Sequence, residues 1–245
     1  MNIKHFIIIC ICCIMFPNFA LADKMEDYIY QVSTIKALLN GDCESDVTIE
    51  TLKEHGDIGI GLLNKLDGSF VAEDGNFYKL NSEDKINIIK DNDKTPFAMM
   101  VHFDPDKALY LKKKISLADM KLNIDKELPS TNLFYAFKIN GKFSNVSLVM
   151  YPEEVEEETK NQKTFNYDNI EGTIVGFKAP EKYKGLSING YQLMFIDKTK
   201  TIGGYLVDCN IQKATVFIDF VYDIYFKLPD EDVLSDYRND AMVDK

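Results

Sequence analysis

Histidine and arginine are scarce in this chain of 245 residues, which has three histidines and a single arginine, Arg238. His5 lies in a segment that we expect to be removed, so the mature protein retains only His55 and His102. A metal site built from three imidazoles is therefore excluded by count, because each ligand position needs its own histidine. A single guanidinium near the C-terminus likewise excludes a central arginine clamp for an anion.

The first 22 residues have the layout of a secretory signal peptide. Lys4 and His5 form a short polar start, an unbroken apolar run covers residues 6–16, and small residues occupy Ala20 and Ala22. That run is too short for a membrane-spanning helix, and no later stretch approaches the length of one. We predict cleavage after Ala22 and export to the periplasm or the outside of the cell.

Cysteine is also sparse beyond the predicted signal peptide, where only Cys43 and Cys209 occur. Two cysteines cannot establish a disulfide framework, so one bridge and two free thiols both stay open. The other cysteines, Cys10, Cys12 and Cys13, lie in the apolar run. A lipid anchor on one of them is the less favoured alternative, because no small residue precedes any of them.

Acidic residues outnumber basic ones by 39 to 28, which gives a net charge of −11. Removal of the signal peptide, with its one lysine and no acid, brings the charge to −12. An acidic surface argues against nucleic acid and anionic lipid as partners. Hydrophobic residues make up 46% of the chain and charged residues 27%, which excludes a disordered chain and favours a globular one.

Short apolar runs separated by Asp-Gly and Asn-Gly turns predict many β-strands. Apolar residues at helical spacing predict helices over residues 28–39 and 108–128, and Asn140-Gly141 predicts a hairpin turn. The predicted class is α+β, with mixed β-sheets in two packed halves at roughly residues 28–150 and 151–230.

Eight stretches, taken in order, make the mature chain resemble the alpha-acetolactate decarboxylase family. They lie at residues 29–34, 55–61, 64–68, 74–78, 95–97, 133–136, 172–177 and 190–191. The resemblance implies that family's fold and its reaction, the conversion of 2-acetolactate to acetoin and carbon dioxide. Loss of the carboxylate leaves an electron pair, and in the family a zinc ion acts as the Lewis acid that stabilises it.

The resemblance also implies three zinc-binding histidines, two alternating along one strand and a third after a Gly-Gly turn. The residues at those positions here are Gln192, Met194 and Tyr205. An amide, a thioether and a phenol do not replace imidazoles, because zinc binds thiolate, imidazole and carboxylate groups. Met194 by itself favours soft copper in principle, but a lone methionine on a strand is far more often a packing residue.

Three further family positions differ as well. Glu171 stands where the family has an arginine for the substrate carboxylate, and this reversal of charge should repel a carboxylate. Ser69 replaces a glutamate and Leu62 replaces a threonine. Glu231 is only a loose candidate for the glutamate that the family has near its C-terminus.

His55, His102 and Glu171 offer an alternative set of metal ligands, although we expect both histidines to have ordinary structural roles. Six positions of the family site are substituted, while the glycines of the scaffold are kept. This pattern predicts a catalytically inactive family member that binds no zinc and retains the pocket. The predicted partner is a small polar or cationic ligand, and a homodimer is open. The alternatives are an active decarboxylase with unrecognised ligands and an envelope-interaction protein.

Overall fold

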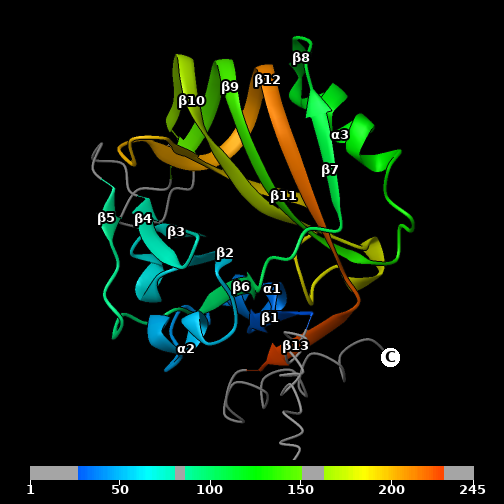
Figure 1. Cartoon of the computed structure of the whole chain (residues 1–245). Coiled ribbons are helices and arrows are strands. Elements are labelled where there is room, and N and C mark those ends of the chain that lie inside the picture. The colour runs from blue at the N-terminus through cyan, green and yellow to red at the C-terminus, as the bar shows by residue number, and fades with distance from the viewer. Residues whose placement is uncertain (1–26, 81–85, 151–162, 229–245) are drawn as a thin grey trace, which may run out of the picture.

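The computed structural model describes residues 27–80, 86–150 and 163–228. Its strands form two sheets, and the long strands of the second sheet stand over the first (Figure 1). The predicted signal peptide, with Cys10, Cys12 and Cys13, lies outside the described residues, as do Glu231 and Arg238. No helix in the described part of the chain is long and apolar enough to cross a membrane.

The first sheet has seven strands and is mixed, because β1 and β13 pair in parallel while its other pairs are antiparallel. Asp74 and Gly75 both have positive φ angles and form the two-residue turn between β3 and β4, as Asp-Gly predicts. In spatial order the strands are β13 (Asp223–Lys227), β1 (Tyr28–Val32), β6 (Phe97–Val101), β2 (Ile58–Leu62), β3 (Ser69–Glu73), β4 (Asn76–Leu80) and β5 (Asn87–Ile88).

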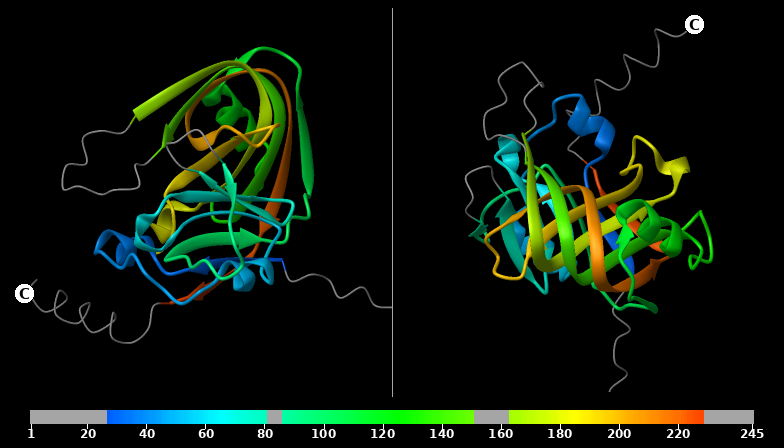
Figure 2. Two further views of the ribbon diagram at one scale, coloured as in Figure 1. Left: turned by 90° about the vertical axis from the view of Figure 1, so that its left-hand side faces the viewer. Right: turned by 90° about the horizontal axis from the view of Figure 1, so that it is seen from above.

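The second sheet is antiparallel and curls, because β11 pairs with both β10 and β12 (Figure 2). Its path is β11 (Gly190–Asp197), β10 (Lys163–Ala179), β9 (Phe134–Met150), β12 (Gly203–Val221) and β7 (Lys107–Leu111), with the short β8 (Ile115–Ser116) on β12. The helical segments are α1 (Ile35–Leu39), α2 (Ile49–Lys53), η1 (Asn64–Leu66), α3 (Leu117–Asp125) and η2 (Glu181–Tyr183).

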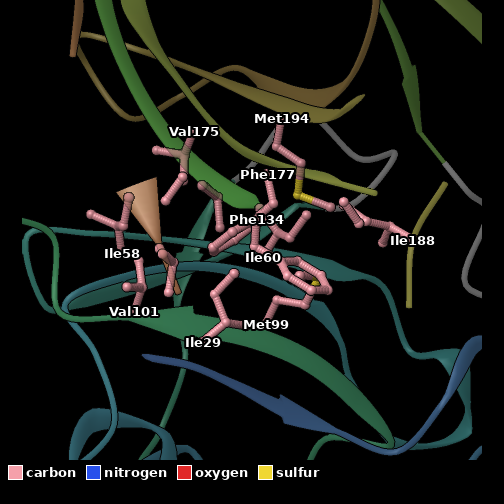
Figure 3. Packing of buried hydrophobic residues seen from close by; sticks show 14 of the residues in the cluster. Ile29, Ile58, Ile60, Met99, Val101, Phe134, Val175, Phe177, Ile188 and Met194 are labelled. Atoms are coloured by element: carbon pink, nitrogen blue, oxygen red, sulfur yellow. The ribbon is translucent and has the colours of Figure 1, made fainter. Parts of the chain in front are cut away.

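The hydrophobic core joins the two sheets. Ile60 and Met99 of the first sheet pack in one cluster with Val175, Phe177 and Met194 of the second (Figure 3). A second cluster fills the curl of the second sheet beneath α3, and a third lies between the first sheet and α2. The chain passes from one sheet to the other between β6 and β7, and β13 returns to the first sheet. The predicted α+β class is confirmed.

The helix predicted over residues 28–39 is wrong for its first half. Tyr28–Val32 forms β1, and the chain then turns at Ser33, whose φ angle is +59°, before Thr34 caps α1. The segment forms a strand because it pairs with neighbours on both sides, and this tertiary pairing outweighs a helical spacing of apolar residues.

The helix predicted over residues 108–128 is confirmed only over Leu117–Asp125. Its first part forms β7, in which alternate residues are exposed, and then β8. Ser116 begins α3 by accepting a hydrogen bond from the backbone N–H of Asp119.

The hairpin predicted at Asn140-Gly141 is also wrong, since β9 passes through both residues without a turn. A Cβ atom at position 141 would lie 2.9 Å from the side chain of Ala214 and 2.9 Å from the carbonyl oxygen of Lys213. The glycine therefore permits the close approach of β12, which is the other common reason for a glycine within a strand.

Cys43 and Cys209 are free thiols, which resolves the alternatives that the sequence left open. Cys209 is fully buried on β12, and burial is the main cause that raises the pKa of its thiol to about 12. A protonated, inaccessible thiol is unreactive, so Cys209 acts as a small core residue.

Candidate functional site

A cavity of about 440 Å³ is bounded by elements of both sheets and by α1. The lining is mainly aliphatic and aromatic, with a few polar groups, which is typical of small-molecule sites. The residues that line it are Ile35, Leu38, Leu39, Ile60, Gly61, Leu62, Phe97, Lys184, Gly185, Ser187, Ile188, Asn189, Gln192 and Tyr205.

Three of the six positions singled out from the sequence, Leu62, Gln192 and Tyr205, line this cavity. Met194 is fully buried beside it, and its Cα pairs with that of Tyr205 in the β11–β12 ladder. Side chains alternate along a strand, so Gln192 and Met194 lie on the same face of β11. The positions that the resemblance assigns to zinc ligands thus lie together, although they come from two strands.

Ser69 and Glu171 do not line the cavity. Ser69 is buried on β3, opposite Leu62 in the β2–β3 ladder. The Glu171 carboxylate forms ion pairs with the ammonium groups of Lys142 and Lys198 instead. Glu171 is also distant from Met194 along β10. It precedes Val175, the β10 partner of Met194, by four residues, or about 13 Å along an extended strand.

The β11–β12 turn is held by the carboxylate of Asp197, which is 4% exposed. It accepts hydrogen bonds from the backbone N–H groups of Thr199 at 2.9 Å, Thr201 at 2.7 Å and Ile202 at 2.6 Å. Burial acts to raise the pKa of Asp197, but these hydrogen bonds and one from the Thr199 hydroxyl together lower it. The anchored turn fixes the register that places Met194 opposite Tyr205.

The chain segment before β11, which forms part of the cavity wall, is held by the buried side chain of Gln31 on β1. Its amide nitrogen donates hydrogen bonds to the carbonyl oxygens of Ser33 at 2.9 Å and Leu186 at 2.8 Å. Its amide oxygen accepts one from the hydroxyl of Ser187 at 2.6 Å. The segment that contributes Lys184 and Ser187 to the lining is therefore fixed against the first sheet.

Several residues at the cavity escape prediction from sequence. Lys184 and Asn189 belong to no recognisable motif, and only the folded chain brings them to the lining. Val149 of β9 pairs with Tyr205 in the β9–β12 ladder and is 9% exposed, so β9 also borders the cluster of predicted ligand positions. Gln31 lies within a stretch of the family resemblance, but nothing in the sequence indicates its distant partners.

His55 and His102, the two histidines among the described residues, do not line the cavity. Nδ1 of His55 and the hydroxyl of Tyr28 share a hydrogen bond of 2.8 Å. The ring of His55 also stacks on that of Tyr30, with 3.8 Å between the ring centroids. Burial is the main cause that lowers the pKa of His55, although the charge of Glu54 opposes it. Nε2 of His102 lies 3.2 Å from the carbonyl oxygen of Glu54. Both rings therefore have structural partners.

The residues of the cavity do not fit zinc. An amide, a thioether and a phenol stand where the resemblance implies three imidazoles, and these neutral groups are poor zinc ligands. Within residues 27–80, 86–150 and 163–228, no three side chains of histidine, cysteine, aspartate or glutamate are grouped so that they could hold a metal ion.

The fold is that of solved acetolactate decarboxylases. The crystal structure of alpha-acetolactate decarboxylase from Bacillus subtilis strain 168 matches with a TM-score of 0.79 and 37% identity, over 83% of this chain and 89% of that one. A Staphylococcus aureus protein of unknown function, described as similar to alpha-acetolactate decarboxylase, matches with a TM-score of 0.77 and 28% identity, over 86% of this chain and 99% of that one.

Sequence comparison gives the same result. The alpha-acetolactate decarboxylase of Methanosarcina mazei is 34% identical over 215 residues, which is 85% of this chain and 75% of that protein. The family model for alpha-acetolactate decarboxylase matches residues 29–241. The chain belongs to the alpha-acetolactate decarboxylase family.

Proposed function

We propose that this family member does not decarboxylate acetolactate and that its retained cavity binds a small molecule. The observation that carries the proposal is that Gln192 and Tyr205 line the cavity while Met194, the β11 partner of Tyr205, is buried beside them. The scaffold keeps these three positions together, while their side chains lack the donor groups that hold zinc.

The chemistry of the reaction supports this proposal. Loss of carbon dioxide from a 2-hydroxy-3-keto acid leaves an electron pair, and a nearby cation must stabilise the resulting enediolate. Among the described residues that line the cavity, the only cationic side chain is Lys184, which is exposed. A solvated ammonium in a high-dielectric environment stabilises a developing charge only weakly.

A second candidate function is an active decarboxylase, which the names of the relatives favour. That function needs a cation held by groups other than the three substituted positions. We also retain export as a proposal, because it depends on residues 1–22, whose sequence has the layout of a signal peptide. A homodimer stays a prediction.

We expect the purified chain to retain no zinc after equilibration with zinc chloride and exhaustive dialysis, since no suitable donor set lines the cavity. The measurement is elemental analysis by mass spectrometry beside a relative that keeps the three histidines. One zinc ion per chain would contradict the proposal and favour the active decarboxylase.

A further inference from the structure

The charge of the cavity lining differs from what the sequence suggested. The sequence predicted a small polar or cationic ligand in a pocket that includes Glu171, but Glu171 does not line the cavity, and its carboxylate pairs with Lys142 and Lys198. Among the described residues that line the cavity, Lys184 is the one with a charged side chain. A cationic ligand therefore finds no opposite charge there, whereas an anionic ligand finds one.

Lys184 is available to a ligand. Within the described ranges its ammonium has no ion-pair partner, unlike Lys178, which pairs with Asp125 at 2.5 Å. Its position is fixed by its own backbone, since the N–H of Lys184 donates to the carbonyl oxygen of Glu181 at 3.0 Å. On its other side, the backbone N–H of Lys36 in α1 donates to the carbonyl oxygen of Gly185 at 2.9 Å. The backbone that bears the ammonium is thus held before a ligand arrives, which lowers the entropic cost of binding.

The rest of the lining is suited to a hydrocarbon body. Leu38 contributes apolar surface from α1, Ile60 and Phe97 from strands β2 and β6 of the first sheet, and Ile188 from the segment before β11. Burial of a short aliphatic chain against such side chains contributes about 0.8 kcal/mol for each methylene group. The volume of about 440 Å³ lies in the lower part of the range of small-molecule sites.

We propose that the cavity binds a small aliphatic monocarboxylate, with its hydrocarbon body among Leu38, Ile60 and Phe97 and its carboxylate at Lys184. This inference rests on the proposed function, because it takes the cavity as a binding site without a metal. Gln192 supplies an amide at the lining, which can donate a hydrogen bond to a carboxylate or to a substituent near it.

The test compares three probes with the same branched body and different charge: 4-methylpentanoate, 4-methylpentanamide and 4-methylpentylamine. Isothermal titration with the full chain should show the carboxylate binding about fivefold more tightly than the amide, with the amine weakest. The preference should diminish at high salt, because Lys184 is exposed.

Two substitutions of Lys184 and a control at a neighbouring lysine distinguish the effect of the Lys184 charge from a general effect on folding. Lys184→Gln should lower carboxylate affinity to that of the amide, while Lys184→Arg should retain most of it. Lys182→Gln is the matched control, because Lys182 is exposed, stacks over Tyr183 and does not line the cavity. It should leave the affinity unchanged.

Equal or tighter binding of the amide or the amine would overturn the inference, as would an unchanged carboxylate affinity in Lys184→Gln. Absence of binding by all three probes would also overturn the inference. It would not affect the proposed loss of catalysis if the chain is zinc-free and inactive. Retention of zinc by the native chain would instead contradict the proposed function, whichever probe binds.

Discussion

Zinc should bind about a thousandfold more tightly to a variant with Gln192→His, Met194→His and Tyr205→His than to the native chain. The expectation follows from the geometry of β11 and β12. Residues 192 and 194 share one face of β11, and residue 194 lies opposite residue 205 in the ladder. Three imidazoles at these positions would supply the ligand set that the native side chains lack.

Competition with a chromophoric zinc chelator measures this affinity, and a rise in the unfolding temperature with zinc gives an independent readout. The matched control carries Gln192→Asn, Met194→Leu and Tyr205→Phe, which alters the same three positions without adding a zinc ligand. If the histidine variant folds but binds zinc no better than this control, the three positions do not surround one point.

The free energy of unfolding should decrease as the pH rises from about 4 to about 7, because of Asp219 on β12. The side chain is 1% exposed, and burial is the main cause that raises its pKa to about 7, with the charge of Asp27 adding to it. The folded state therefore keeps a proton that the unfolded state releases in this window. Asp219 stabilises the fold below its unfolded pKa, and this contribution is lost as the pH rises through the folded pKa.

Asp219→Asn removes the ionisation and keeps an oxygen that can accept the hydrogen bond from the backbone N–H of Asp104. Each unit of pKa difference corresponds to about 1.4 kcal/mol, so the variant should be more stable than the native chain by about 2–4 kcal/mol near pH 8. Near pH 4 the two proteins should have similar stability.

Urea denaturation at both pH values gives these free energies. Asp223→Asn is the matched control, because Asp223 is exposed on β13 and should change stability little at either pH. A gain for Asp219→Asn that is no larger near pH 8 than near pH 4 would show that Asp219 ionises normally in the fold.

Local turn chemistry and short apolar runs predicted much of the first sheet. The Asp74-Gly75 turn has the expected positive φ angles, and the apolar segments at residues 58–62 and 97–101 are strands. The failure over residues 28–32 has a different origin. Those residues form a strand because β6 and β13, which lie far away in the sequence, pair with both of its edges. No local pattern contains that information.

The candidate site divides in the same way. The family resemblance implied that positions 192, 194 and 205 lie together, and the β11–β12 ladder has residue 194 opposite residue 205. Lys184 could not be predicted, because its place depends on the buried contacts of Gln31 with the segment 184–189. The surroundings of Glu171 depend likewise on Lys142 and Lys198, which come from other parts of the chain.

Acetoin formation from racemic 2-acetolactate tests the central claim most directly. The purified chain is assayed with and without added zinc, beside the alpha-acetolactate decarboxylase of Bacillus subtilis. The predicted result is acetoin at the spontaneous rate in both conditions, while the Bacillus subtilis protein gives rapid turnover. Zinc-dependent turnover by this chain would contradict the account, because it would require a metal site that Gln192, Met194 and Tyr205 cannot supply.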